Sequence, residues 1–268
     1  MTNWDILAIF AVLLFGVPHG GLDGAVARRI GWPTSVVSWL VFHLAYIALA
    51  ALVAVLWWLF PLTSLSMFLL ISALHFGASD IIDVGTDVLP WATHGGLVCI
   101  VIPSLQPTLV EPIFTILVGA DNASLLMNVI TNLFFPWLLC LAGYSFFAYR
   151  QPQYRKYLIS LLVFIGLIFM LPPLISFSLY FCLWHSRGHM LRLWHSLERT
   201  ERHRSVTEAS IYTVISWISA GIIFYFYQET SSIALINITF IGLAALTLPH
   251  MLLVDYADRK SYLQGKLK

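Results

Sequence analysis

Residues 174–195 read LISFSLYFCLWHSRGHMLRLWH, an apolar segment long enough to cross a bilayer that carries His185 and His189 beyond its midpoint. A transmembrane helix needs about 20 mostly apolar residues. An ionisable side chain inside such a span is costly and normally marks a functional site. The two histidines are four residues apart, a spacing that puts both rings on one face of a helix. The segment therefore predicts a transmembrane helix that presents two imidazoles to one site.

The rest of the chain has the same apolar character. Of its 268 residues, 59% are hydrophobic and only 10% are charged, whereas soluble domains carry about 25% charged residues. The mean hydropathy is +0.85. We expect an all-α, polytopic transmembrane helix bundle of about 8–9 spans, folded as a single integral membrane domain over residues 1–268. The apolar segments cover about 4–22, 34–59, 64–80, 91–105, 125–149, 157–172, 174–195, 208–228 and 233–255.

The region 91–121 is the least regular of these. Pro103, Pro107 and Pro112 interrupt it, and Glu111 adds a charge. Proline removes a helical hydrogen bond and breaks or kinks a helix. We expect 108–119 to form a short interfacial or re-entrant helix rather than a span.

The basic residues predict how the chain crosses the membrane. With nine spans and the N-terminus outside, all but Arg187 of the basic residues considered fall on the cytoplasmic side, as the positive-inside rule requires. This arrangement predicts a multi-pass protein of the cytoplasmic (inner) membrane with a cytoplasmic C-terminus. The net charge of +1 gives no reason to expect a nucleic-acid partner. The basic groups are Arg28 and Arg29; Arg150, Arg155 and Lys156; Arg192, Arg199, Arg202 and Arg204; and Arg259, Lys260, Lys266 and Lys268.

Five histidines lie within the first, third, seventh and ninth apolar segments, which all run from outside to inside. In a bundle these histidines share the inner half of the membrane and are expected to converge between helices. Several neutral imidazoles brought together in this way are suited to hold a metal ion. The candidates for metal ligands are His19, His75, His185 and His189, with His250 as an additional ligand or a neighbour of the metal.

The other histidines have different expectations. His43 and His94 are interpreted as structural residues within spans, and His195 and His203 as solvated residues of a basic loop.

Carboxylates follow the buried histidines along the chain. Asp23 lies four residues after His19, Asp80 five after His75 and Asp255 five after His250. A carboxylate can orient a metal-bound imidazole through its second ring nitrogen. Glycines beside the histidines indicate close helix approach or room for a ligand. They are Gly20, Gly21, Gly77 and Gly188.

The imidazole ligands limit which metals and which classes of enzyme the site fits. An all-imidazole site suits iron, copper, zinc or nickel. The His-Glu-x-x-His motif is absent, which argues against a zinc protease, and the histidines are too few for the boxes of membrane di-iron enzymes. We expect one non-haem iron with an open position for O₂ beside a lipid-soluble substrate. Nearby aromatic residues that are candidates to line the substrate path are Phe76, Tyr180 and Trp184.

Four short motifs, in this order and over nearly the whole chain, resemble the Brp/Blh (bacteriorhodopsin-related-protein-like) family of membrane β-carotene 15,15′-dioxygenases. They are GVPHGGLD at 16–23, HFGASD at 75–80, WHSRGH at 184–189 and Pro249-His250. The family's first motif commonly reads Pro-His-Gly-Ala-Leu-Asp-His. Here Gly21 replaces the alanine and Gly24 replaces the last histidine, which leaves the ligand set unchanged.

The resemblance implies an activity. It implies oxidative cleavage of β-carotene by O₂ at its central 15,15′ double bond, which gives two all-trans-retinal molecules that supply a microbial rhodopsin. It also implies Fe(2+) held by His19, His75, His185 and His189.

Two other functions use the same histidines. One is a membrane transporter or channel for a metal ion or protons, in which the histidines form a relay. The internal repeats typical of many transporters are not found in this sequence. The other is a bis-histidine haem protein, which a Soret absorption band would reveal.

Overall fold

The structure is a computed structural model that describes residues 1–81 and 87–266; Lys268, part of the basic tail, lies outside them. The described residues form helices and no strand, which confirms the all-α prediction. The elements are α1 Asn3–Ala11, η1 Val12–Gly16, η2 Val17–Leu22, α2 Asp23–Arg29, α3 Val36–Leu59, α4 Pro61–Ser79, α5 Val88–Gly96, η4 Leu97–Val101, α6 Ile102–Leu105, α7 Pro107–Val118, α8 Ala120–Arg150, η5 Pro152–Tyr154, α9 Arg155–Met170, α10 Pro173–Leu179, η6 Tyr180–Ser186, α11 Arg187–Ser196, α12 Arg199–Phe226 and α13 Ser231–Lys266.

Eight helical stretches in the described part of the chain are long and apolar enough to cross a membrane, in agreement with the expected 8–9 spans. They are Asn3–Arg29, Val36–Leu59, Pro61–Ser79, Val88–Leu105, Ala120–Arg150, Pro152–Met170, Arg199–Phe226 and Ser231–Asp258. α7, with 12 residues, is a separate short apolar helix, as expected for this proline-containing region.

The stretch 173–196 is helical throughout, because α10, η6 and α11 follow one another without a break. It is absent from the eight candidates. Its histidines and arginines lower its mean hydropathy. The segment that carries the histidine pair is therefore less apolar than the helices counted as candidate spans.

The chain divides into two compact units. Unit 1 comprises Met1–Val12 and Phe60–Gly188, and unit 2 comprises Leu13–Leu59 and His189–Lys268. The prediction of a single domain is not tested by this division. Each unit is described separately below.

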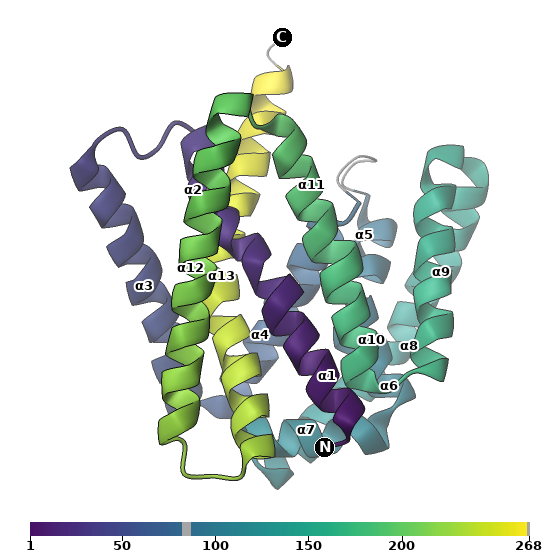
Figure 1. The fold of residues 1–268 in the computed structure, drawn as a ribbon. Coiled ribbons are helices and arrows are strands. Elements are labelled where there is room, and N and C mark those ends of the chain that lie inside the picture. The colour runs from purple at the N-terminus through teal and green to yellow at the C-terminus, as the bar shows by residue number, and fades with distance from the viewer. Residues whose placement is uncertain (82–86, 267–268) are drawn as a thin grey trace. The chain divides into compact units, whose positions relative to one another are not determined.

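In unit 1, α4 packs closely against α5, and α8 contacts α5 and α7. Gly77 and Gly95 make the first contact possible. A Cβ atom on Gly77 would collide with the carbonyl oxygen of Trp91, and one on Gly95 with that of Ala73. The close approach predicted for Gly77 is therefore confirmed. Figure 1 shows α7 lying crosswise at the lower end of this unit.

In unit 2, α13 packs on α3, and α12 packs on η2. Figure 1 shows α12 and α13 side by side, joined by a short turn at their lower ends. The side chain of Arg28 links α2 to α12. It forms ion pairs with Glu201 at 2.9 Å and with Glu208 at 2.5 Å. A small apolar cluster lies beside it and consists of Ala25, Val26, Leu193, Val254 and Ala257.

Several helices depart from α geometry where the candidate site residues lie. η1 and η6 are π-helical, and η2 is a 3₁₀ helix that starts next to Pro18. Proline cannot donate the backbone hydrogen bond that an α-helix needs at that position. π-helical turns inside α-helices are often found at functional sites. His19 lies in η2, and His185 lies in η6.

Candidate functional site

Unit 1 brings together His75 of α4 and His185 of η6. Both side chains are buried, and their ring centroids are 5.1 Å apart. Asp80, the residue that ends α4, accepts a hydrogen bond of 2.8 Å from His185 Nδ1. The carboxylate that follows His75 in the sequence thus orients the histidine of another segment.

The same carboxylate has two further partners. Tyr180 Oη donates to Asp80 Oδ2 at 2.5 Å, and Ser79 Oγ donates to Asp80 Oδ1 at 3.2 Å. Both carboxylate oxygens are therefore hydrogen-bonded, as a buried charged group requires. Phe76 packs edge-on against the His185 ring at 4.7 Å. The site in unit 1 is a buried histidine–carboxylate pair within an aromatic wall.

Unit 2 holds three further imidazoles. The ring of His19 lies 4.8 Å from that of His250 and 6.0 Å from that of His189, and the rings of His189 and His250 are 5.4 Å apart. All three side chains are buried. The structure therefore places His250 in direct contact with two of the predicted ligands, so it belongs to the same cluster.

Oxygen acceptors fix the orientation of two of these rings. His250 Nδ1 donates to Asp23 Oδ1 at 2.7 Å, and Tyr46 Oη donates to Asp23 Oδ2 at 2.8 Å. His19 Nδ1 donates to the carbonyl oxygen of Gly16, three residues earlier. A carbonyl or carboxylate oxygen only accepts here, so the proton must be on Nδ1.

His19, His185 and His250 thus share one tautomer, with the proton on Nδ1 and the lone pair on Nε2. This is the arrangement in which histidines commonly bind metals, with the second ring nitrogen donating to a carboxylate or carbonyl. If imidazoles bind a divalent ion tetrahedrally at roughly 2 Å, their ring centroids lie about 5 Å apart. Three of the four centroid distances within the units are of this size, and the fourth, between His19 and His189, is 6.0 Å.

The donors fit a divalent transition metal in type. Across residues 1–81 and 87–266, no three His, Cys, Asp or Glu side chains are already arranged around a common metal position. The expectation that His185 and His189 share one helix face concerns the junction of the two units and stays a prediction.

The other predicted residues fall into two groups, hydrogen-bonded and exposed. His43 Nδ1 donates to Trp39 O at 2.8 Å, and its Nε2 atom is hydrogen-bonded to Tyr212 Oη at 2.6 Å, which agrees with a structural role. His195 and His203 are exposed, and so is Asp255. Asp23 is the carboxylate bonded to His250, and the role of the exposed Asp255 stays a prediction.

Sequence reasoning did not single out Tyr46. It is one of 11 tyrosines and has no motif around it. Its hydroxyl reaches Asp23 only because α3 packs on α13, which carries His250. The hydroxyl of Tyr180 is bonded to Asp80, and its expected place along a substrate path stays a prediction.

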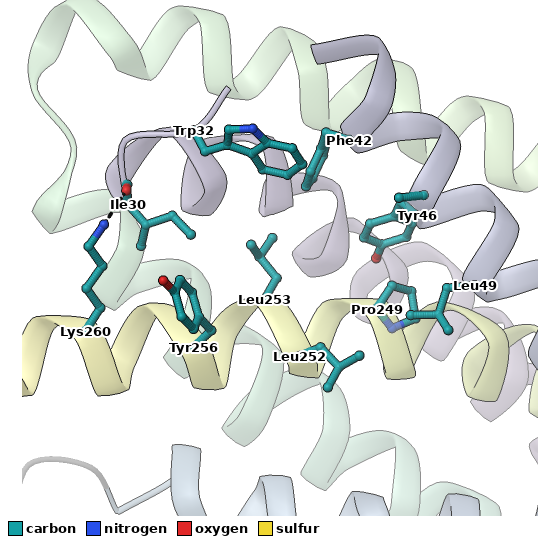
Figure 2. A pocket seen from close by; sticks show the side chains of 11 residues that line it. Ile30, Trp32, Phe42, Tyr46, Leu49, Pro249, Leu252, Leu253, Tyr256 and Lys260 are labelled. Atoms are coloured by element: carbon teal, nitrogen blue, oxygen red, sulfur yellow. Dashed lines mark hydrogen bonds between the residues drawn. The ribbon is translucent and has the colours of Figure 1, made fainter. Parts of the chain in front are cut away.

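An apolar pocket of ≈ 470 Å³ lies in unit 2 between α3 and α13 (Figure 2). One face of each helix lines it, and the turn carrying Ile30 and Trp32 closes one end. Tyr46 lines this pocket, and its hydroxyl group also donates the hydrogen bond to Asp23. Lys260 Nζ donates to Ile30 O at the same end as the turn. The remaining lining residues are Phe42, Ala45, Leu49, Pro249, Leu252, Leu253 and Tyr256.

The helices and the buried histidine–carboxylate pairs define a class of protein, a polytopic membrane protein with an internal imidazole site. The sequence profile of the family described as "Beta-carotene 15,15'-dioxygenase" matches residues 10–258. The chain therefore belongs to the β-carotene 15,15′-dioxygenase family, and the family predicted from its four motifs is confirmed.

Two relatives illustrate the similarity. The chain is 33% identical over 284 residues to "Beta-carotene 15,15'-dioxygenase" of an uncultured marine bacterium, which covers 100% of this chain and 98% of the relative. It is 25% identical over 287 residues to "Probable beta-carotene 15,15'-dioxygenase Blh" of Halobacterium salinarum, covering 94% and 83%. No solved structure gives a significant match.

Proposed function

We propose that this protein cleaves β-carotene at its central 15,15′ double bond with O₂, in the membrane, to give two all-trans-retinal molecules. Membership of the family supports this reaction, as do the names of the two relatives. The eight apolar helices suit an enzyme whose substrate is dissolved in a bilayer.

We propose that the enzyme holds one non-haem Fe(2+). The proposed ligands are His19, His75, His185 and His189, and the ring cluster of unit 2 adds His250 to them. The observation that carries this proposal is the proton position shared by three of the imidazoles. The Nδ1 atoms of His185, His250 and His19 donate to Asp80, Asp23 and Gly16 O. Iron bound in this way would supply the activation of O₂.

The protein's own groups would prepare that site. Asp80 and Asp23 hold His185 and His250 in the tautomer that directs a lone pair from Nε2. Burial of the rings excludes water, which protects reactive oxygen chemistry from side reactions. Neutral ligands leave the positive charge of the metal uncompensated, which favours a reduced oxygen species nearby.

The apolar pocket of unit 2 is the proposed place for one end of the substrate (Figure 2). Its lining is mostly hydrocarbon and aromatic, and it includes Pro249, the neighbour of His250. Phe76, Tyr180 and Trp184 stay candidates for contact with the polyene. Phe76 lies against the His185 ring, whereas the half-buried Trp184 packs on Phe164.

We propose that the enzyme lies in the cytoplasmic membrane with its N-terminus outside and its C-terminus in the cytoplasm. The basic residues named above support this orientation. The retinal product would pass to a microbial rhodopsin.

Expression in a bacterium that makes β-carotene, followed by chromatography of extracted pigments, tests the reaction. We expect loss of β-carotene and appearance of retinal, and the absence of retinal would contradict the proposed activity. Elemental analysis of the purified protein should give about one iron per chain. Zinc alone with full activity would contradict the iron, and a Soret band would favour a haem protein instead.

A further inference from the structure

Two buried carboxylates, one in each unit, are shared between a histidine and a tyrosine. In unit 2, the Oδ1 atom of Asp23 accepts from His250 Nδ1 at 2.7 Å, and its Oδ2 atom accepts from Tyr46 Oη at 2.8 Å. The tyrosine comes from α3, and the histidine comes from α13.

Unit 1 repeats this pattern atom for atom. The Oδ1 atom of Asp80 accepts from His185 Nδ1 at 2.8 Å, and its Oδ2 atom accepts from Tyr180 Oη at 2.5 Å. The two sets come from unrelated parts of the chain, so local sequence similarity does not account for the repetition.

We propose that Tyr46 and Tyr180 are positioning residues for the metal site, each acting through its aspartate on a histidine ligand. This proposal rests on the proposed iron centre. A carboxylate bonded through one oxygen can rotate about its own side chain. A second bond to the other oxygen fixes the carboxylate plane, and with it the direction from which the imidazole donates. The ring is thereby held at one rotation.

The π-helical segment η6 explains how unit 1 achieves this geometry. Tyr180 and His185 are five residues apart. In an α-helix, residues at that spacing point about 140° apart. In a π-helix the hydrogen bonds join residues i and i+5, so such a pair lies on nearly the same side. The π turn therefore lets both side chains reach the two oxygens of Asp80.

In unit 2, the tyrosine has an additional anchor close to the histidine. Tyr46 Oη lies 3.3 Å from Leu246 O, one helical turn before His250 on α13. The single hydroxyl proton is directed mainly to Asp23, and the carbonyl is the longer branch of a shared bond. Tyr46 therefore ties α3 to the part of α13 that carries the ligand.

The test compares Tyr46→Phe and Tyr180→Phe with wild-type full-length enzyme, purified with its iron. Phenylalanine keeps the ring and removes only the hydroxyl. We expect iron to leave the variants about 10-fold faster under a chelator, the lower end of the effect for groups that orient metal ligands. We also expect a changed electron paramagnetic resonance spectrum of the Fe(II)–nitric oxide complex, which a purely structural hydroxyl would not alter.

Two matched variants serve as controls. Tyr212→Phe in unit 2 removes a hydroxyl bonded to His43, a histidine outside the cluster. Tyr144→Phe in unit 1 removes a buried hydroxyl that donates to Tyr154 O. Both should keep the wild-type release rate and spectrum. Wild-type release and spectra in the Tyr46 and Tyr180 variants would overturn the proposal.

A double-mutant cycle separates action through the carboxylate from a direct effect. In an Asp80→Asn background, Tyr180→Phe should cause no further acceleration of iron release, and additive acceleration would overturn the proposal for unit 1. Asp23→Asn with Tyr46→Phe tests unit 2 in the same way. If a single tyrosine variant does not fold, the corresponding aspartate–tyrosine double variant is used in its place. In the double variant the buried carboxylate is gone as well, so no buried charge is left without its hydrogen-bond donor. Wild-type protein without any iron would instead refute the proposed function itself.

Discussion

Asp23 accepts a 2.7 Å hydrogen bond from His250, although the two residues are 227 positions apart in the sequence. Asp23 lies four residues after His19, yet its partner is in the last long helix. Asp80 shows the same relationship. It follows His75 in the sequence but accepts a hydrogen bond from His185. In both units the carboxylate thus links two segments, and each histidine depends on a residue from elsewhere in the chain.

The first prediction concerns this pair. Asp23→Asn should weaken iron retention and activity by about 10–100-fold, because the amide has one acceptor oxygen and no charge, so it cannot accept from both His250 and Tyr46 as the carboxylate does. Asp255→Asn, whose side chain is exposed, should leave both near the wild-type level. Iron content after dialysis and retinal formation measure the two effects. The reverse order of the two variants would show that the wrong carboxylate has been assigned to His250.

The second prediction concerns the histidine pair of 174–195. His185→Ala and His189→Ala should each reduce retinal formation by more than about 100-fold, since each removes a proposed ligand rather than its supporting partner. The variants should still insert in the membrane, which fractionation and immunoblotting can check. His195→Ala should keep most of its activity because the side chain is exposed. An inactive His195→Ala with an active His189→Ala would move the site toward the end of α11.

The third prediction concerns the pocket of unit 2. Ala45→Trp should fill space between α3 and α13 and raise the KM for β-carotene by about 10-fold, a typical penalty for a changed apolar pocket. Leu44→Trp, at the neighbouring exposed position outside the lining, is the matched control. Steady-state assays in detergent give kcat and KM for both. Equal KM values would indicate that the substrate does not occupy this pocket.

The fourth prediction concerns the contact between α4 and α5. Gly77→Ala should destabilise the protein by about 1–3 kcal/mol, because the new methyl group meets the backbone and ring of Trp91. Gly166→Ala, in α9 with nothing within 4 Å of the added atom, should be neutral or stabilising by up to about 1 kcal/mol. Thermal unfolding followed by circular dichroism compares them. A stable Gly77→Ala protein would mean that the two helices can separate at little cost.

The fifth prediction concerns topology. A reporter active only in the cytoplasm should function when fused after Lys268 and be silent when fused after Glu229, in the turn between α12 and α13. This follows from the positive charges at Arg259 and Lys260 and from α13 as a span. Activity at both positions would show that α12 and α13 do not both cross the membrane.

The sequence by itself determined the helical membrane fold, because long apolar segments can satisfy their backbone groups in a bilayer only as helices. It also determined the family, since the four motifs are local and can be read in order. The short helix at Pro107–Val118 followed from prolines, whose effect on the backbone is likewise local.

Only the tertiary structure decided the partners of the buried histidines. In the sequence, Asp23 lies near His19 and Asp80 lies near His75. In the folded structure, Asp23 accepts a hydrogen bond from His250, and Asp80 accepts one from His185. Tyr46 has no local signal at all, and its role depends on the contact of α3 with α13. Hydrogen bonds between side chains act over about 3 Å, so they depend on which helices meet, and a periodic pattern within one segment does not contain that information.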